Sequence, residues 1–221
     1  GSRIAAEGIV NYYQNHDSIL LLELNAETDF VARDANFINL AESIAKKLLE
    51  NDESDIAQEI SNDITSAISK LGENIKLRRY LKIKKNNSVY GYSHNNKIAS
   101  LVELKKDNES LAKDICMQIV ASNPLSLDEA SIDSNILSSE KEIYKKELEK
   151  IDKKEDIKRN ILEGKMKKFI NDNTLINQPF VKDPSTSISK IIKDNSIISF
   201  TRYEVGEGIE KKTEDFAQEV Y

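Results

Sequence analysis

An internal repeat sets the strongest limit on the fold of this chain. When the sequence is shifted by 80 positions, as from Tyr12 to Tyr92, several apolar and polar residues coincide. Each copy has the pattern of two strands joined by a polar turn and followed by an amphipathic helix. Two copies of one small α+β unit, packed together, would form the body of the protein. The other coinciding pairs are Ile9 with Val89, Leu21 with Leu101, Leu22 with Val102, Glu23 with Glu103 and Leu24 with Leu104.

Periodic apolar patterns in both copies predict the individual elements. Alternating apolar residues predict strands, and apolar residues spaced three and four positions apart predict helices. Gly72 stands where the second predicted helix should end. The expected elements are strands over 4–13, 18–26 and 74–85 and helices over 37–48, 54–71 and 109–122.

Residues 135–172 differ in character from the rest of the chain. They contain no proline, a single glycine (Gly164) and many lysines and glutamates, and their apolar residues fall in two narrow seams. This pattern predicts an antiparallel coiled-coil helical hairpin that projects from the body. Asp152 followed by Glu155 resembles a capping box at the start of its second helix.

After the hairpin the chain returns to compact structure. A loop fixed by Pro179 and Pro184 precedes a short helix near 186–194 and an alternating strand over 196–205. The fold class is therefore α+β, with two related subdomains that each hold a small antiparallel sheet and helices, an inserted helical hairpin and a C-terminal helical module. We expect a core N-subdomain over 1–87, a core C-subdomain over 88–134 and 173–208, the hairpin over 135–172 and the C-terminal module over 209–221.

Charge argues against a nucleic-acid-binding function. The chain of 221 residues carries a net charge of −6, and its pI near 5.2 disfavours binding to a phosphate backbone. A local basic cluster on the predicted strand over 74–85 is interpreted as a solvated strand edge, where lysines discourage pairing between sheets. We therefore expect no direct contact with nucleic acid. The cluster consists of Arg78, Arg79, Lys82, Lys84 and Lys85.

Hydropathy and cysteine content indicate the compartment. The longest apolar run, Ile19–Leu22, has 4 residues and is far too short to span a membrane. The single cysteine, Cys116, allows no intramolecular disulfide and fits a reducing environment. We expect a cytoplasmic protein without a membrane partner.

No catalytic or metal-binding set assembles in the sequence. His16 and His94 each fall near a predicted hairpin turn and lack metal-ligand spacing. Cys116 lies in an apolar helical stripe, and no serine or cysteine has a partner pattern around it. Gly206 and Gly208 lack the longer glycine spacing and the lysine of a nucleotide loop. We expect neither covalent chemistry nor a cofactor.

The corner between the second strand and the first long helix holds an unusual pair, Asp29 and Phe30. The segment "LLLELNAETDFVARDANF" places this pair after a strand stops and before the apolar helix begins at Phe37. Phenylalanine is usually buried, so Phe30 could pack onto the following helix, and the residues alone favour this interpretation. An aromatic ring held outward at a rigid joint could instead enter a pocket of a partner protein and contribute much of the affinity.

Sequence strings spread over the chain match those of a known family in the same order. They are "RIAAEGIV", "ETDFVARDANF", "GENIKLRRY", "GYSHNNKIASLV", "EGKMKKFI", "QPFVKDPS" and "RYEVGEGIEKKTEDFAQEV". By these strings the chain is identified as a member of the bacterial-type elongation factor Ts family, the guanine-nucleotide exchange factors of elongation factor Tu. The resemblance implies the same two-subdomain core, coiled-coil hairpin and C-terminal module. The family begins with a small ubiquitin-associated-like domain, which we expect this chain to lack.

The resemblance also implies a mechanism and a partner. Phe30 would wedge into the nucleotide domain of elongation factor Tu, met in its GDP-bound form and kept in a nucleotide-free complex, and would disturb the site of Mg²⁺ and the phosphates. Phe30 would then be partly exposed with Asp29 beside it, which reverses the interpretation from the residues alone. The alternative is a non-catalytic scaffold or homodimer formed through the hairpin. The resemblance assigns partner binding to Thr28, Asp29, Phe30, Val31, His94, Val181, Lys182 and Phe216.

Overall fold

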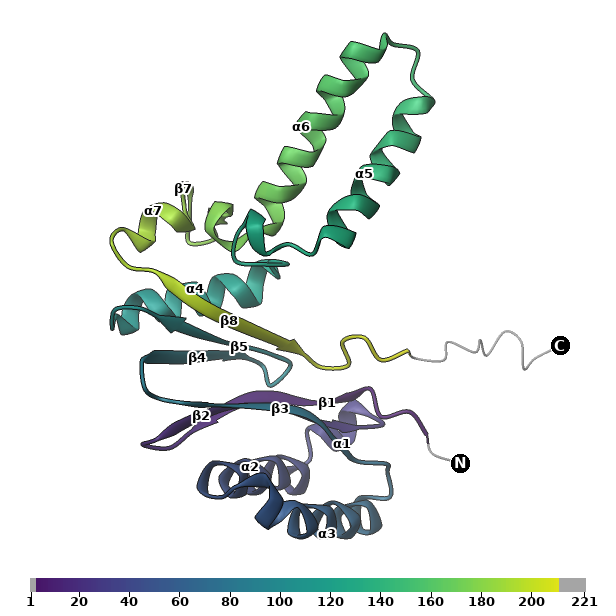
Figure 1. Cartoon of the computed structure of the whole chain (residues 1–221). Coiled ribbons are helices and arrows are strands. Elements are labelled where there is room, and N and C mark those ends of the chain that lie inside the picture. The colour runs from purple at the N-terminus through teal and green to yellow at the C-terminus, as the bar shows by residue number, and fades with distance from the viewer. Residues whose placement is uncertain (1–2, 211–221) are drawn as a thin grey trace, which may run out of the picture.

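The computed structural model describes residues 3–210 and arranges them in stacked layers (Figure 1). Two three-stranded antiparallel sheets lie face to face, helices α2 and α3 cover the outer face of the first sheet, and α4 covers the second. The architecture is α+β, as the sequence predicts. The first sheet with its helices comprises β1 (Glu7–Gln14), β2 (Ser18–Ala26), β3 (Lys76–Lys84), α1 (Asp29–Ala32), α2 (Ala35–Glu50) and α3 (Glu53–Leu71), and the second comprises β4 (Ser88–His94), β5 (Ile98–Leu104), β8 (Ile197–Glu204) and α4 (Glu109–Ser122).

β2 is the central strand of the first sheet, and all 9 of its residues are buried. Because successive side chains of a strand point to opposite faces, β2 contributes to two cores. Leu20, Leu22 and Leu24 pack with the apolar faces of α2 and α3. Ile19 and Leu21 pack against the second sheet. The short apolar run in the sequence is therefore a strand enclosed between a helical layer and a sheet.

Local residues determine where α2 begins and where α3 ends. Asp34 caps α2 by accepting a hydrogen bond from the backbone N of Asn36 (2.8 Å). α3 ends at Gly72, whose φ of 74° lies in the left-handed region that glycine adopts at no steric cost. The predicted end of this helix is confirmed.

The two sheets repeat one design. Their strand orders are β1-β2-β3 and β4-β5-β8. The pairing register shifts between Glu23 and Leu24 in the first sheet and between Glu103 and Leu104 in the second. These are the positions that coincide when the sequence is shifted by 80 residues, so the internal repeat extends to the place of an irregularity such as a β-bulge.

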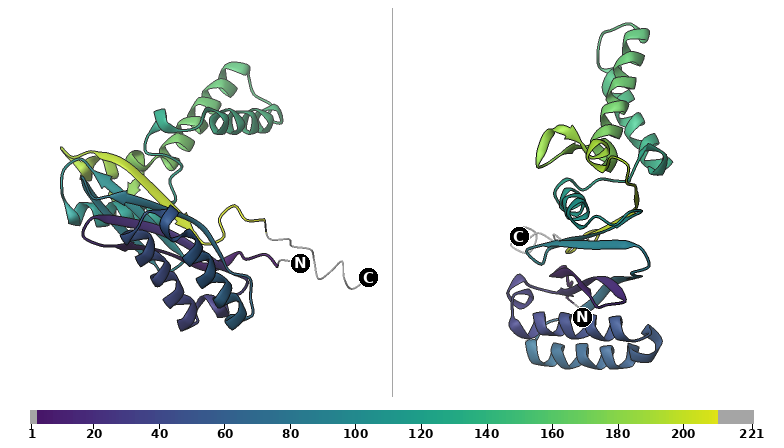
Figure 2. Two further views of the ribbon diagram at one scale, coloured as in Figure 1. Left: turned by 60° about the horizontal axis from the view of Figure 1, so that its bottom comes forward. Right: turned by 90° about the vertical axis from the view of Figure 1, so that its left-hand side faces the viewer.

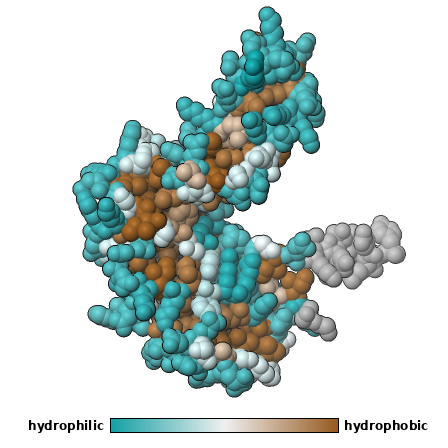
Figure 3. Space-filling model, in the orientation of Figure 1, coloured by the Kyte–Doolittle hydropathy of each residue, from teal (hydrophilic) through white to brown (hydrophobic). Residues whose placement is uncertain are grey.

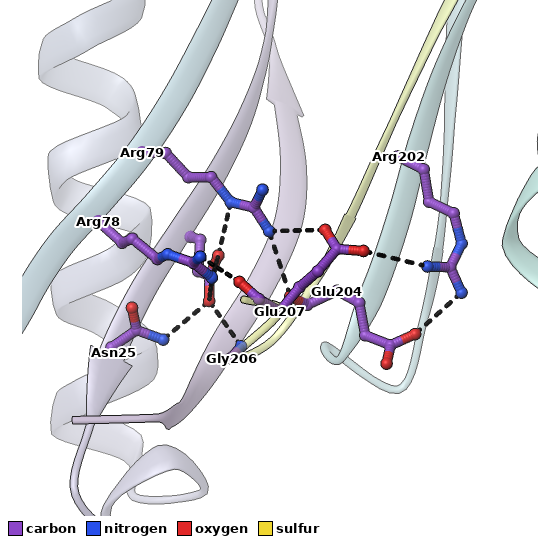
Figure 4. A network of polar contacts seen from close by, with 8 residues as sticks. Asn25, Arg78, Arg79, Arg202, Glu204, Gly206 and Glu207 are labelled. Carbon is purple, nitrogen blue, oxygen red and sulfur yellow. Dashed lines mark hydrogen bonds and ion pairs between the residues drawn. The ribbon is translucent and has the colours of Figure 1, made fainter. Parts of the chain in front are cut away.

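A buried carboxylate fastens the two sheets together at one end. Glu23 of β2 has no exposed surface. Two arginines of β3 and the backbone N of Gly206 after β8 donate hydrogen bonds to its carboxylate, and Figure 4 shows these donors. The interpretation of these arginines as part of a solvated edge is wrong, because a buried anion on the adjacent strand holds them by charge-assisted hydrogen bonds. The donors are Arg78 Nη1 (3.1 Å), Arg79 Nε (2.7 Å), Asn25 Nδ2 (2.9 Å) and the backbone N of Gly206 (2.8 Å).

α5 (Ser134–Glu149) and α6 (Glu155–Asn173) form the predicted helical hairpin, which projects from the body (Figures 1 and 2). Much of its surface is hydrophilic (Figure 3), and α6 buries none of its residues. Its coiled-coil packing stays a prediction. The predicted capping box with Asp152 as N-cap is wrong. α6 begins at Glu155, so Lys154 occupies the N-cap position, and it makes no side-chain cap hydrogen bond.

Small elements connect the hairpin to its neighbours in the body. The segment expected to be a loop contains a two-stranded ribbon, β6–β7. The subdomain boundaries stay predictions, and the module expected over 209–221 lies almost entirely outside the described residues. Within residues 3–210, no helix combines the length and apolar character that crossing a membrane requires. The connecting elements are η1 (Glu129–Ser131), η2 (Leu175–Asn177), β6 (Pro179–Phe180), β7 (Asp183–Ser187) and α7 (Ile188–Ile192).

Candidate functional site

α1 is a single helical turn at the corner between β2 and α2. A helix this short gains little from its own hydrogen bonds, so its first turn depends on side-chain partners. Thr28 caps it by accepting a hydrogen bond at Oγ1 from the backbone N of Val31 (3.3 Å). The carboxylate of Glu73 accepts hydrogen bonds from the backbone N (3.0 Å) and Oγ1 (2.8 Å) of Thr28. The corner is thereby fastened to the segment between α3 and β3.

This turn directs Phe30 outward. The side chain of Phe30 is 79% exposed, whereas Ala32 is buried and Val31 packs against the core of the first sheet. Successive helical residues point about 100° apart, so a turn that buries Ala32 leaves Phe30 on the opposite side. The expectation of an exposed Phe30 is confirmed, and burial against the following helix is excluded.

Two cations hold Asp29, which adjoins Phe30. Lys97 Nζ lies 2.7 Å from Oδ1 and Arg33 Nε lies 3.2 Å from Oδ2. The hydrogen bond and charge of Lys97, with a smaller contribution from Arg33, lower the pKa of Asp29 from its ordinary value. The guanidinium carbon of Arg33 also lies 5.7 Å from the centre of the Phe30 ring. The corner therefore presents an apolar ring beside an ionised carboxylate and a guanidinium.

Lys97 is a residue that the sequence reasoning missed. It lies in the turn between β4 and β5, and its ammonium also donates to the carbonyl oxygen of Gly8 (2.8 Å). The one available indication was its position three residues after His94 in a predicted turn. His94 is exposed at the end of β4, with Nε2 at 3.2 Å from Nδ2 of Asn95. The structure thus joins the turn of His94 to the corner of Asp29 through Lys97.

Two further predicted site residues, Val181 and Lys182, lie elsewhere in the described part of the chain. Val181 and Lys182 form the turn between β6 and β7, which lies beyond α4 and both sheets as seen from α2 and α3 (Figure 1). The backbone N of Val181 donates to Gln118 Oε1 (2.8 Å), and Lys182 Nζ lies 2.9 Å from Asp114 Oδ1. This turn is therefore anchored on α4 and separate from the Phe30 corner. Phe216 lies outside the described residues.

The other chemically reactive side chains among residues 3–210 form no second site. Cys116 is buried, and burial raises the pKa of its thiol to about 12, so it is no nucleophile at neutral pH. His16 is exposed next to Asp17. In residues 3–210, no group of three or more histidine, cysteine, aspartate and glutamate side chains is arranged to hold a metal ion.

The fold and the corner together define the class of protein: an α+β, two-sheet body that carries an exposed aromatic ring on an internally fastened turn. A short, internally fastened turn presents an aromatic ring and a carboxylate from a two-sheet body, which is a geometry suited to insertion into a partner.

Comparisons with known proteins give the family. The family model described as "Elongation factor TS" matches residues 27–207. The chain belongs to the elongation factor Ts family, a family of translation elongation factors. The proteins named elongation factor Ts from Legionella pneumophila strain Paris and from Clostridium acetobutylicum are 38% and 42% identical to this chain, with 99% of the chain and 80% of each relative covered. The protein of that name from Marinobacter nauticus is 41% identical over 99% of the chain and 78% of its own length.

Proposed function

We propose that the chain is a guanine-nucleotide exchange factor for elongation factor Tu and promotes release of GDP in the cytoplasm. The observation that carries this proposal is the exposure of Phe30 on a corner that is held from within. Covering a ring of this size with a partner's pocket is worth about 1.5–3 kcal/mol. Because the corner is already ordered, little of that free energy is lost to immobilising it.

The proposed mechanism is a wedge. Phe30 enters the partner's nucleotide domain and displaces the groups that hold Mg²⁺ and the phosphates of GDP. The contact forms best in the partner conformation that binds GDP poorly. Binding of this chain therefore lowers the partner's affinity for GDP, and binding of GDP lowers the partner's affinity for this chain by the same factor. A coupling of about 1–3 kcal/mol corresponds to roughly 5–150-fold. The chain meets the GDP-bound partner and remains in a nucleotide-free complex, and no covalent bond is made or broken.

Further contacts are proposed around and away from the wedge. Thr28, Asp29 and Val31 flank Phe30 in the chain, and His94 adds a contact from the neighbouring turn. On the β6–β7 turn, the ammonium of Lys182 is engaged with Asp114. Val181 is 44% exposed there and offers an apolar contact. Phe216 completes the proposed set.

Release of a fluorescent GDP from elongation factor Tu tests the proposal. We expect the parent chain to accelerate release and Phe30→Ala to lose at least about tenfold of that acceleration, as for an interface hot spot. The matched control is Ile198→Ala, which removes another large apolar side chain that is 48% exposed on β8, and should leave release unchanged. Equal acceleration by the parent and Phe30→Ala rejects the wedge, and no acceleration by the parent rejects exchange.

A second candidate function is self-association through the hairpin. It is favoured by exposed isoleucines on both hairpin helices, with Ile143 of α5 at 49% and Ile157 of α6 at 42% exposure. The molar mass in solution, measured by light scattering for the parent and for Ile143→Lys, distinguishes a monomer from a dimer. A dimer that the charged variant dissociates supports a homodimer or scaffold, and a parent that is monomeric at all concentrations rejects it.

A further inference from the structure

The ammonium of Lys97 connects two segments that are far apart in the sequence. It lies 2.7 Å from Oδ1 of Asp29 in α1 and 2.8 Å from the carbonyl oxygen of Gly8 in β1. The Lys97 and Asp29 side chains are 36% and 44% exposed. An ion pair exposed to this degree contributes little to global stability, so its main effect is on local geometry.

The turn that carries Lys97 is fixed through its backbone. The carbonyl oxygen of Asn96 accepts a hydrogen bond from the backbone N of Val10 (2.9 Å), and its side-chain Oδ1 accepts one from Nδ2 of Asn11 (2.6 Å). The carbonyl oxygen of Lys97 accepts one from the backbone N of Val205 (2.9 Å). The lysine therefore reaches toward α1 from a base that is attached to β1 and to the segment after β8.

His94 begins this same turn, and the backbone N of Lys97 donates to its carbonyl oxygen (3.0 Å). His94 and Phe30 come from the two different sheet units of the fold, so their relative placement depends on what joins the units. Asp29 precedes Phe30 directly, and Lys97 closes the turn that His94 opens. The pair of Asp29 and Lys97 is thus a direct link between the two surface residues.

We propose that Lys97 is a positioning residue of the exchange surface, which fixes the Phe30 corner and the His94 turn in the relative placement that the partner meets. The inference rests on the proposed function and adds to it a residue that acts through Asp29 and not by touching the partner. Preorganisation of this kind raises affinity by lowering the cost of ordering on binding.

The first test measures the geometry in the free protein. Lys97→Met removes the ammonium and keeps most of the stem, and Lys106→Met is the matched control, because Lys106 pairs with Asp194 at 3.0 Å in the same unit. In a carboxylate NMR titration, Lys97→Met should raise the pKa of Asp29 and leave that of Asp194 unchanged, and Lys106→Met should do the reverse. Amide signals of both the corner and the turn should move in Lys97→Met only.

The second test measures exchange. The concentration needed for half-maximal GDP release should rise about two- to fivefold in Lys97→Met, the range that a half-exposed ion pair supports. Because Lys97 acts through Asp29, the variant that carries both Lys97→Met and Asp29→Asn should be no weaker than Asp29→Asn alone. Lys97→Arg should restore most of the loss, and Lys106→Met should match the parent.

The outcomes separate this inference from the function on which it rests. Two outcomes would mean that Lys97 contacts the partner directly, and either would overturn the positioning role. One is that the losses of exchange in Lys97→Met and Asp29→Asn add up in the double variant. The other is that Lys97→Met weakens exchange while the amide signals of the Phe30 corner do not move. If Lys97→Met leaves the half-maximal concentration unchanged while Phe30→Ala loses its acceleration of GDP release as expected, the positioning role of Lys97 is rejected and the wedge mechanism stands. Normal exchange by Phe30→Ala rejects the wedge and the positioning role together.

Discussion

Gly91 of β4 lies in close contact with the opposite sheet. A Cβ added at this position would lie 2.7 Å from the ring of Tyr12 and 3.0 Å from Cδ2 of Leu101. Tyr12 belongs to β1 of the opposite sheet, so even a methyl group would force the Tyr12 ring or the sheets themselves to shift. A small residue at this position is a requirement of packing.

The substitution Gly91→Ala should lower the free energy of unfolding by about 1–3 kcal/mol, the range for an added methyl in a filled core. Gly164→Ala is the matched control, because a Cβ there meets no atom within 4 Å and the site lies inside α6. The control should stabilise that helix by roughly 0.5–1 kcal/mol. Urea unfolding monitored by circular dichroism measures the first, and amide exchange in α6 the second. Equal stability of Gly91→Ala and the parent would show that the sheets are not in close contact here.

Two ionisable groups with raised pKa, Cys116 and Tyr13, should make the stability of the fold sensitive to alkaline pH. Burial raises the pKa of Cys116 from 9.0 to about 12 and is the main cause that raises the pKa of Tyr13 from 10.0 to about 12. As pH rises, the unfolded chain releases these protons first, so stability is complete below about pH 9 and declines between about 9 and 12. Melting temperatures at pH 7–11 should show this decline, with a smaller slope in Cys116→Ala. Identical slopes in both proteins would contradict the assignment to the thiol.

The exposure of Phe30 shows what a residue pattern leaves open. A helix of 4 residues is too short to show an apolar periodicity in the sequence. Which of its side chains face outward therefore depends on its contacts with the rest of the protein. Those contacts are Glu73, which lies 45 positions from Thr28, and Lys97, which lies 68 positions from Asp29. The residues alone therefore favoured burial, and only the resemblance to a family predicted the exposed ring.

At the scale of elements, periodicity predicted the helices and strands better than it predicted their ends. α4 spans the range 109–122 that its apolar stripe indicates. α6 starts at Glu155, and Asp152 lies two positions before its N-cap. A capping box needs its acceptor at the N-cap itself, so a shift of two residues removed the predicted cap.

The missing cap can be supplied. In Lys154→Asp, a carboxylate at the N-cap of α6 can accept from the backbone N–H groups of the first turn, where the backbone N of Ile157 now donates to Asp156 Oδ1 (3.0 Å). The helix dipole also favours this carboxylate, and the cap is worth about 1 kcal/mol. Amide exchange in that turn should slow by roughly fivefold. The control is Asn108→Ala in α4, where Asn108 already caps the helix through Leu111 N (3.0 Å), and exchange should become faster. No change in the Lys154→Asp variant would show that this end of α6 is not frayed.

At the scale of the whole molecule, equivalent positions of the repeat have different roles. Glu23 and Glu103 coincide in the sequence repeat and adjoin the register shift in their sheets. Glu103 is partly exposed and accepts a hydrogen bond from Nδ2 of Asn87 (2.8 Å). Glu23 is buried between the sheets and joins residues as far apart as Arg78 and Gly206. The sequence shows the repeat, but the difference arises from packing one copy on the other, which no local pattern encodes.

Replacing Glu23 should therefore loosen the connection between the sheets. Glu23→Gln removes the charge that holds Arg78 and Arg79, whose side chains are 22% and 27% exposed and can turn to solvent. We expect a loss of about 3 kcal/mol, the lower end for a broken buried pair, and faster amide exchange at Gly206, which donates to this carboxylate. Glu103→Gln, the equivalent change in the other sheet, should alter neither quantity. Equal effects of the two substitutions would mean that the sheets are held by their apolar faces alone.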